Sequence, residues 1–280
     1  MTIGESLEPS GTASIDQDTQ DRIHALWDEL ADFDVAHAEH ARSHLLRSIC
    51  ELIDAQNATW IGAVRLGSTK LSASGQPDPI RGWRPRAIRP LHPSSRFEKL
   101  TKEQAELLEA GCVDETVIAN VAGAGHFRVN LVSELVSPAW YEGDYYRAFY
   151  RGAGYGDVIW AGVPVNADAE CYFGFNRGLD KPPFGVGEKM IVAAALHGLR
   201  WFHRQQLLSE GLSIASAPLT SLERRVLHGL LQGLSDKKIA TEQKLGENTV
   251  REYVKRIFRK YGVGSRTALM ALWLGKSPSP

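Results

Sequence analysis

The sequence predicts an α+β domain, in which helices flank a central antiparallel sheet, followed by a small all-α domain of four helices. Short apolar runs rich in β-branched and aromatic residues, which are typical of strands, occur between residues 59 and 175. Apolar residues at three- and four-residue steps, which indicate helices, stand before and after these runs. Residues 219–275 show helical patterns alone. A chain of 280 residues is long enough for two such domains.

The first predicted helix lies between Ala36 and Gln56. A short β-rich run over residues 59–64 then predicts the first strand. The apolar residues of the helix fall at three- and four-residue steps and form one stripe, which we expect to be buried: Leu45, Leu46, Ile49, Cys50, Leu52 and Ile53.

The segment 73–97 holds five prolines and five arginines, so we expect a loop there with one strand near Ile88. Thr101 is expected to cap a helix that ends at Gly111. Aromatic residues after Pro138 suggest a further helix.

The strongest strand pattern in the chain covers residues 158–165 and 171–175. Both runs are almost wholly apolar and turn residues separate them, which predicts an antiparallel hairpin in the middle of a sheet. A long helix from about Gly187 to Leu208 is expected to close the domain. This order of elements is similar to that of PAS and GAF domains, and the hairpin end at Phe173–Arg177 strengthens the similarity to GAF-like input domains.

Charge divides the chain in the same way as the helical and strand patterns do. Residues 216–280 carry twelve Lys and Arg against five Asp and Glu, a net charge of +7, whereas residues 1–215 carry a net charge of −8. A basic end on an acidic body indicates an anionic partner for the C-terminal part. The predicted organisation is a disordered tail over 1–20, an input or oligomerisation domain over 21–210, a linker over 211–218, a helical domain over 219–275 and a disordered tail over 276–280.

Composition excludes several other classes of protein. Three cysteines without a Cys-x-x-Cys pair do not make a disulfide scaffold or a cysteine zinc module. No stretch is long and apolar enough for a membrane span, and the acidic N-terminus lacks the pattern of a signal peptide. We therefore expect a cytoplasmic protein that makes no contact with membranes.

The C-terminal region contains three successive helix start signals. Thr220 and Glu223 make a capping box, and Ser235 caps a short second helix. A turn containing Gly246 leads to a third helix that starts near Glu247. A short helix, a glycine-bearing turn and a longer helix have the spacing of a helix-turn-helix.

The third helix has a buried stripe and a basic outer face. Val250, Val254, Ile257 and Tyr261 step by four, three and four residues and predict the stripe. Arg251 and Lys255 are one turn apart and lie together on another face of the helix. A basic face of this kind suits the major groove of double-stranded DNA. The residues that we expect to contact DNA are Lys237, Lys238, Thr249, Arg251, Glu252, Lys255, Arg256, Arg259 and Lys260.

Several short motifs resemble those of the LuxR/GerE helix-turn-helix family. They are Leu219-Thr220, Glu223-Arg224, Gly233-x-Ser235, Lys238-Ile239-Ala240, Thr249-Val250-Arg251, Tyr261-Gly262-Val263 and Ser265-Arg266. The resemblance implies a regulator of transcription that binds DNA as a homodimer. RNA polymerase is a further candidate partner. The resemblance places Arg251, Glu252 and Lys255 at the base edges and the helix 266–274 at the dimer contact. Gly246 departs from the family, which has a capping serine there, and Gln243 replaces a usual leucine.

For the first domain we predict a sensor of a small ligand or of a partner. Six aromatic residues are candidates to line an apolar pocket, although they suit a plain core equally well: Trp60, Trp140, Tyr145, Trp160, Phe173 and Phe175. Three alternatives remain open, namely a ligand-free dimerisation scaffold, an enzymatic domain and an acyl-homoserine-lactone-binding domain. The candidates for the last are Trp140, Tyr145, Tyr146 and Asp157.

Other polar clusters are interpreted as structural. His37, His40 and His44 share one helix face, but no further ligand is identifiable for a metal. Cys171 lies within a predicted strand and suits the core better than a nucleophilic role. We expect no catalytic residues, no bound metal and no cofactor.

Overall fold

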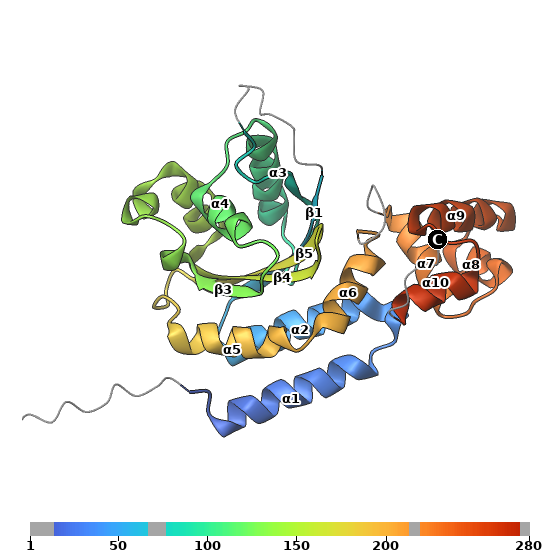
Figure 1. The fold of residues 1–280 in the computed structure, drawn as a ribbon, viewed down its shortest axis with the longest axis horizontal. Helices are drawn as coiled ribbons and strands as arrows, with labels where there is room; N and C mark the ends of the chain where they lie inside the picture. The colour runs from blue at the N-terminus through green and yellow to red at the C-terminus, as the bar shows by residue number, and fades with distance from the viewer. Residues whose placement is uncertain (1–13, 67–76, 213–218, 275–280) are drawn as a thin grey trace, which may run out of the picture.

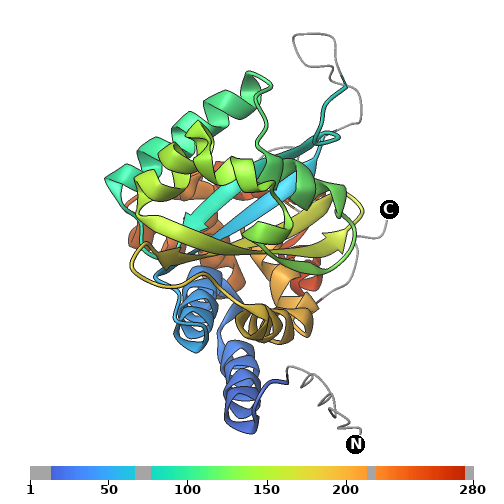
Figure 2. The same ribbon diagram turned by 90° about the vertical axis from the view of Figure 1, so that its left-hand side faces the viewer.

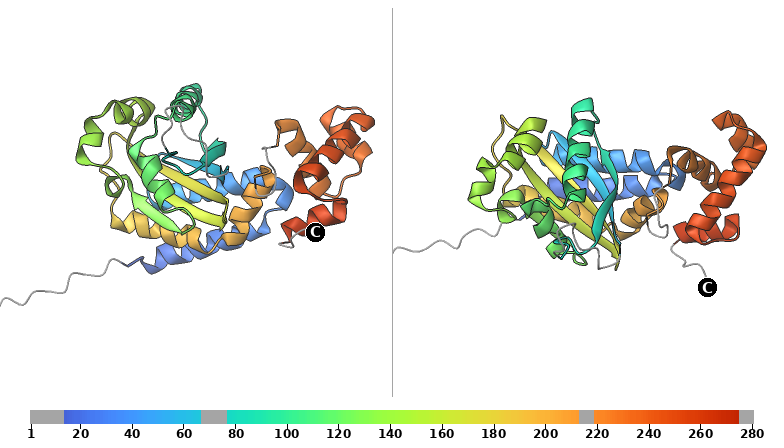
Figure 3. Two further views of the ribbon diagram at one scale, coloured as in Figure 1. Left: turned by 45° about the horizontal axis from the view of Figure 1, so that its top comes forward. Right: turned by 90° about the horizontal axis from the view of Figure 1, so that it is seen from above.

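The computed structural model describes residues 14–66, 77–212 and 219–274 (Figure 1). It contains a five-stranded sheet with helices on both faces, followed by a separate group of four helices (Figures 1 and 3). The predicted α+β domain followed by a helical domain is confirmed. Most of the predicted linker 211–218, the tail 276–280 and most of the tail 1–20 lie outside the described residues.

All neighbouring strands of the sheet are antiparallel, in the order β2-β1-β5-β4-β3. The predicted hairpin is β4 and β5, in which Ile159 lies opposite Phe175. It occupies the middle of the sheet because β5 also pairs with β1. The strands are β1 (Asn57–Arg65), β2 (Trp83–Pro90), β3 (Arg128–Leu131), β4 (Tyr155–Asn166) and β5 (Ala169–Gly178).

One face of the sheet is covered by three helices, on which a fourth packs from outside, and residues of all four contribute to the main core (Figure 2). Helix α2 carries the predicted apolar stripe and packs its Leu45 and Ile49 in this core with Phe173 of β5. The predicted tail 1–20 reaches too far, because Gln17 to Gln20 already belong to a helix whose N-cap, Asp16, accepts a hydrogen bond from the amide of Thr19 (2.9 Å). The four helices are α1 (Gln17–Asp32), α2 (Ala38–Leu52), α5 (Val186–His197) and α6 (Arg200–Ser209).

The predicted long helix from Gly187 to Leu208 is wrong, because it consists of α5 and α6 with a break at Gly198 and Leu199. The Trp27 indole donates a hydrogen bond to the carbonyl of Ala195 (2.9 Å) and packs on Gly198. A Cβ at Gly198 would lie 3.1 Å from that ring. The close approach of α1 therefore favours a glycine at this break, because any larger residue would push the Trp27 ring away.

The other face of the sheet carries α3 (Ser95–Glu109), α4 (Glu115–Ala122) and a series of short turns. The expected cap at Thr101 is wrong, because the cap of α3 lies seven residues earlier, at Ser94, which accepts a hydrogen bond from the amide of Phe97 (3.1 Å). After Pro138 the chain forms a 3-10 helix and, as η4 (Tyr146–Tyr150), a single π-helical turn rather than a regular helix.

The last four helices are α7 (Ser221–Leu231), α8 (Asp236–Gln243), α9 (Glu247–Tyr261) and α10 (Arg266–Trp273). The capping box is present, because Thr220 donates its amide to Glu223 (2.7 Å) and accepts the amide of Glu223 (3.2 Å). The stripe of α9 is buried at Val250, Ile257 and Tyr261 and partly buried at Val254. Across the described ranges, no helix is long and apolar enough to cross a membrane.

Candidate nucleic-acid interface and ligand cavity

Helices α8 and α9 are joined by a tight turn of the helix-turn-helix kind. Lys244 ends α8 in the left-handed conformation (φ 54°), and Gly246 starts α9 in an extended conformation. Because Gly246 has no side chain, it leaves the first amides of α9 without a side-chain cap. These amides carry the positive end of the helix dipole and can meet a phosphate.

The exposed face of α9 gathers basic side chains from two turns of helix. Arg251 lies 2.5 Å from Glu247 and 3.9 Å from Asp236, and Lys255 lies 2.8 Å from Glu252. The Lys255 ammonium lowers the pKa of the Glu252 carboxyl. These ion pairs are exposed and therefore weak, so a DNA phosphate or a guanine edge can compete for the same cations.

Eight of the nine predicted DNA contacts are exposed residues on α8 and α9, and Lys260 is the exception. Its ammonium lies 2.7 Å from the Glu223 carboxylate of α7, and its side chain is largely covered. Helix α9 thus uses its last turn to attach itself to α7. The exposed residues are Lys237, Lys238, Thr249, Arg251, Glu252, Lys255, Arg256 and Arg259.

The helical domain packs against the first domain around one buried carboxylate, that of Glu210 at the end of α6. It accepts two hydrogen bonds from Arg89 of β2 (3.0 and 2.6 Å) and one from Arg224 of α7 (2.7 Å). Arg42 of α2 lies 3.4 Å away. We call these four side chains the Glu210 cluster. It connects three elements of the first domain to the first helix of the second.

Further contacts extend the same junction. The Tyr261 hydroxyl at the end of α9 donates a hydrogen bond to the carbonyl of Leu208. Ala36 and Leu208, both from the first domain, belong to the apolar core of the helical domain. In this arrangement the two domains share packed surface and buried charge.

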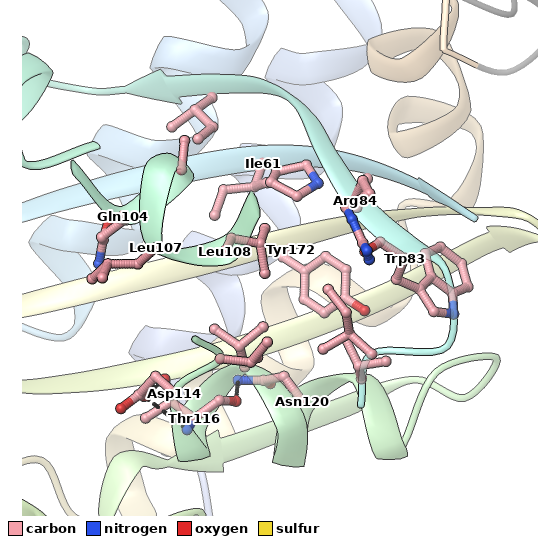
Figure 4. Close-up of a pocket in the computed structure, with 18 of the residues that line it drawn as sticks. Ile61, Trp83, Arg84, Gln104, Leu107, Leu108, Asp114, Thr116, Asn120 and Tyr172 are labelled. Carbon is pink, nitrogen blue, oxygen red and sulfur yellow. Dashed lines mark hydrogen bonds between the residues drawn. The ribbon is translucent and has the colours of Figure 1, made fainter. Parts of the chain in front are cut away.

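A cavity of about 180 Å³ lies between the sheet and helices α3 and α4 (Figure 4). Ile61 and Tyr172 face it from β1 and β5, whereas Leu108 and Asn120 close it from α3 and α4. Strand β2 forms a further wall. Its contribution to the cavity consists of Trp83, Arg84, Pro85 and Ile88.

Of the six aromatic residues predicted for a pocket, Tyr145 and Trp160 line this cavity. Trp60, Phe173 and Phe175 do not, because they are fully buried in the core on the opposite face of the sheet. Side chains alternate between faces along a strand, so Ile61 and Tyr172, which adjoin Trp60 and Phe173, point into the cavity instead. Applying this alternation to each run would have grouped Ile61 with Tyr172.

Trp140 lies beside the cavity and contacts a residue that lines it. Its indole donates a hydrogen bond to Asp114 (2.7 Å), which lines the cavity. Of the other acyl-homoserine-lactone candidates, the Asp157 carboxylate accepts the amide of Phe184 (2.6 Å) and the Tyr146 hydroxyl donates to the carbonyl of Gly156 (2.9 Å). Neither of these two residues lines the cavity.

Two polar atoms at the cavity are buried without a hydrogen-bond partner among the described residues: Oδ1 of Asn120 and the hydroxyl of Tyr172. The amide nitrogen of Asn120 is occupied, because it donates to the carbonyl of Thr116 (2.9 Å). Burial raises the pKa of the Tyr172 hydroxyl, which keeps it neutral. An unpaired buried polar atom is unfavourable, so Oδ1 of Asn120 marks where a ligand can bond, whereas the Tyr172 hydroxyl lies beside the ion pair of Arg128 and Glu170.

The remaining candidate clusters are structural. His44 Nε2 lies 2.6 Å from Glu29, and in the parts of the chain that the structure describes no three His, Cys, Asp or Glu side chains gather as a metal site. The Cys171 thiol is buried against the carbonyl of His203 (3.6 Å), and burial raises its pKa to about 12. A thiol in that state is a poor nucleophile.

Comparison with known proteins identifies the helical domain. Residues 217–273 match the family model described as bacterial regulatory proteins, luxR family. The C-terminal region is a luxR-family domain. The luxR-family helix-turn-helix predicted from its motifs is therefore confirmed. The match covers α7 to α10 and includes the basic face of α9.

Two curated relatives match the chain over lengths close to that of this domain. One is a probable HTH-type transcriptional regulator, GfsR, of Streptomyces halstedii, 43% identical over 65 residues, which are 23% of this chain and 27% of the relative. The other is the nitrate/nitrite response regulator protein NarP of Escherichia coli (strain K12), 45% identical over 56 residues, or 20% and 26%. The chain thus spans about a quarter of the length of the curated relatives it matches.

The chain also aligns with a solved structure described as SdiA in complex with octanoyl-rac-glycerol, at 13% identity and a TM-score of 0.46. The alignment covers 94% of this chain and 96% of that one.

Proposed function

We propose that this chain is a sequence-specific DNA-binding regulator of transcription, which acts on double-stranded DNA as a homodimer and responds to a small molecule held by its first domain. The observation that carries the proposal is the exposed basic face of α9 within a luxR-family domain. A helix of this kind fits the major groove, where Arg and Lys read guanine and neutralise phosphates. A single module of this size buries too little surface for operator affinity, which favours a dimer.

The cavity supports the sensing part of the proposal. It is largely apolar, as ligand sites generally are, and it lies inside the domain that is joined to the DNA-binding helices. This favours a sensor over the alternatives of a dimerisation scaffold without ligand and of an enzyme. RNA polymerase remains a proposed partner by analogy with regulators of transcription.

Strand β2 offers a path from the cavity to the DNA-binding helices. Ile88 lines the cavity, and the next residue, Arg89, holds Glu210 on the other side of the strand. A ligand that displaces β2 therefore changes the Glu210 cluster, which also holds Arg224 of α7. Such a path works only if the ligand has different affinities for two arrangements of the junction.

The experiment is selection of binding sites from a library of random duplexes by the full chain. The expected product is a short motif repeated with two-fold symmetry at a spacing of one helical turn. The Arg251→Ala variant is expected to lose the motif, whereas Lys102→Ala, which removes an exposed charge from α3, retains it. Recovery of random sequence by the unaltered chain would refute the proposed function.

A further inference from the structure

We infer that the cavity binds a neutral, single-ring aromatic molecule that donates one hydrogen bond, and that Asn120 Oδ1 accepts this bond. The inference rests on the proposed sensing role and adds the chemical class of the ligand. It depends on the size of the cavity, the kind of side chain that lines it, its charges and its unpaired polar atoms.

Size restricts the ligand to about one ring with a small substituent. The cavity measures about 180 Å³. An engineered apolar cavity of about 150 Å³ in another protein holds one benzene molecule. A long acyl chain with a polar head needs considerably more space than this.

The walls favour an aromatic ring. Trp83, Tyr145, Tyr150, Trp160 and Tyr172 all line the cavity. Aromatic rings prefer edge-to-face or offset contacts with other rings, and these contacts stabilise a bound ring beyond its burial. The internal hydrogen bonds of these walls are in place, because Gln104 donates to the Tyr145 hydroxyl (3.1 Å) and Trp160 donates to that of Tyr150 (3.4 Å).

The charges favour a neutral ligand. Among the described lining residues, Arg84 and Asp114 are the two with a formal charge. Arg84 is paired with Asp78 (2.9 Å), whereas Asp114 accepts from Trp140 and from the amide and hydroxyl of Thr116. Since Arg84 is already paired with Asp78 and both oxygens of Asp114 already accept hydrogen bonds, neither is free to partner an ionic ligand, whose buried charge would be strongly unfavourable.

The unpaired acceptor, Oδ1 of Asn120, indicates that the ligand carries a hydrogen-bond donor. Asn120 is 5% exposed, and its Oδ1 is an acceptor with no partner among the described residues. The bond from its Nδ2 to Thr116 fixes which end of the amide is left for the ligand.

The test is calorimetric titration of the full chain with three probes that share one ring size. Para-ethylphenol is neutral and carries a donor, para-ethylanisole is neutral without a donor, and para-ethylbenzoate is an anion. We expect the phenol to bind about tenfold more tightly than the methyl ether and the benzoate to show no binding. Equal affinities of phenol and ether would refute the hydrogen bond donated by the ligand, and preferred binding of benzoate would refute the inference that the ligand is neutral.

Two variants locate the bond. Asn120→Leu keeps the approximate volume and is expected to reduce the phenol-to-ether ratio to about one. Leu108→Trp fills the cavity from α3 and should abolish binding of both, whereas the exposed Lys102→Ala on the same helix leaves both unchanged. A chain that selects a DNA motif but binds none of the probes would overturn the ligand class alone, and a chain that binds phenol but selects no motif would overturn the DNA-binding function alone.

Discussion

Replacing Glu210 by Gln tests how much the junction between the domains depends on one buried carboxylate. The side chain is 1% exposed and faces three guanidinium groups, of which Arg42 is itself buried. Burial lowers the pKa of Arg42 to about 10, and the carboxylate of Glu210 opposes that shift. The Glu210→Gln substitution would keep the shape of the side chain and remove its charge, leaving the arginines to repel one another.

Removing one partner of a buried ion pair costs about 3–5 kcal/mol of folding free energy. The lower end applies here, because Arg89 is about one third exposed and Arg42 is at the long distance of 3.4 Å. For a chain of this size about 3 kcal/mol corresponds to a fall in melting temperature of roughly 6–12 °C. It would be a large part of a typical total stability of about 5–15 kcal/mol.

The assay is differential scanning calorimetry of the unaltered chain, Glu210→Gln and the control Glu106→Gln, whose carboxylate is exposed on α3. We expect one transition for the unaltered chain and the control, and two transitions for Glu210→Gln, because the helical domain would be released from the first. A single transition for Glu210→Gln, with a melting temperature within about 2 °C of the control, would refute this reasoning.

The remaining predictions concern pH, DNA and assembly. Burial lowers the pKa of His203 to about 4, so below pH 6.5 the unfolded chain binds more protons than the folded chain. The free energy of unfolding therefore decreases as the pH falls from 6.5 toward 4. Denaturant titrations should show a loss of roughly 1.5 kcal/mol between pH 6.5 and 5, and this loss should be absent in His203→Gln. Arg251→Ala should lose about 1–3 kcal/mol of binding to the selected site and little on random duplex. Lys238→Ala should weaken binding to both duplexes alike and reduce the number of counterions released on binding, given by the salt dependence of the affinity, by about one. Ala271→Glu, on the outer side of α10, should leave the melting temperature unchanged but shift sedimentation toward monomer and weaken operator binding; an unaltered dimer would place the interface elsewhere.

The sequence was most informative where local chemistry decides the structure. The caps at Thr220 and Ser235 and the spacing of Val250, Ile257 and Tyr261 are local features, and the structure contains them as predicted. The hairpin of β4 and β5 was equally accessible, because a continuous apolar run between turn residues has few other solutions.

Two features could not be read in this way. Residues 171–175 are apolar throughout, so strand alternation separates Tyr172 from Phe173, but no polar residue shows which of the two sets faces the cavity and which faces the helices. The sequence near Glu210 does not indicate its ion pairs either, because Arg42 and Arg89 are more than one hundred residues distant along the chain. Such contacts follow from the tertiary structure alone.

Whether α9 reads a DNA sequence is tested most directly by the ratio of two dissociation constants. The full chain is titrated with its selected duplex and with a scrambled duplex of equal length and composition, at one physiological salt concentration. We predict that the selected duplex binds at least about a thousandfold more tightly, as specific operators do. A ratio near one would contradict the claim, because the basic face of α9 would then serve only to attract the phosphate backbone.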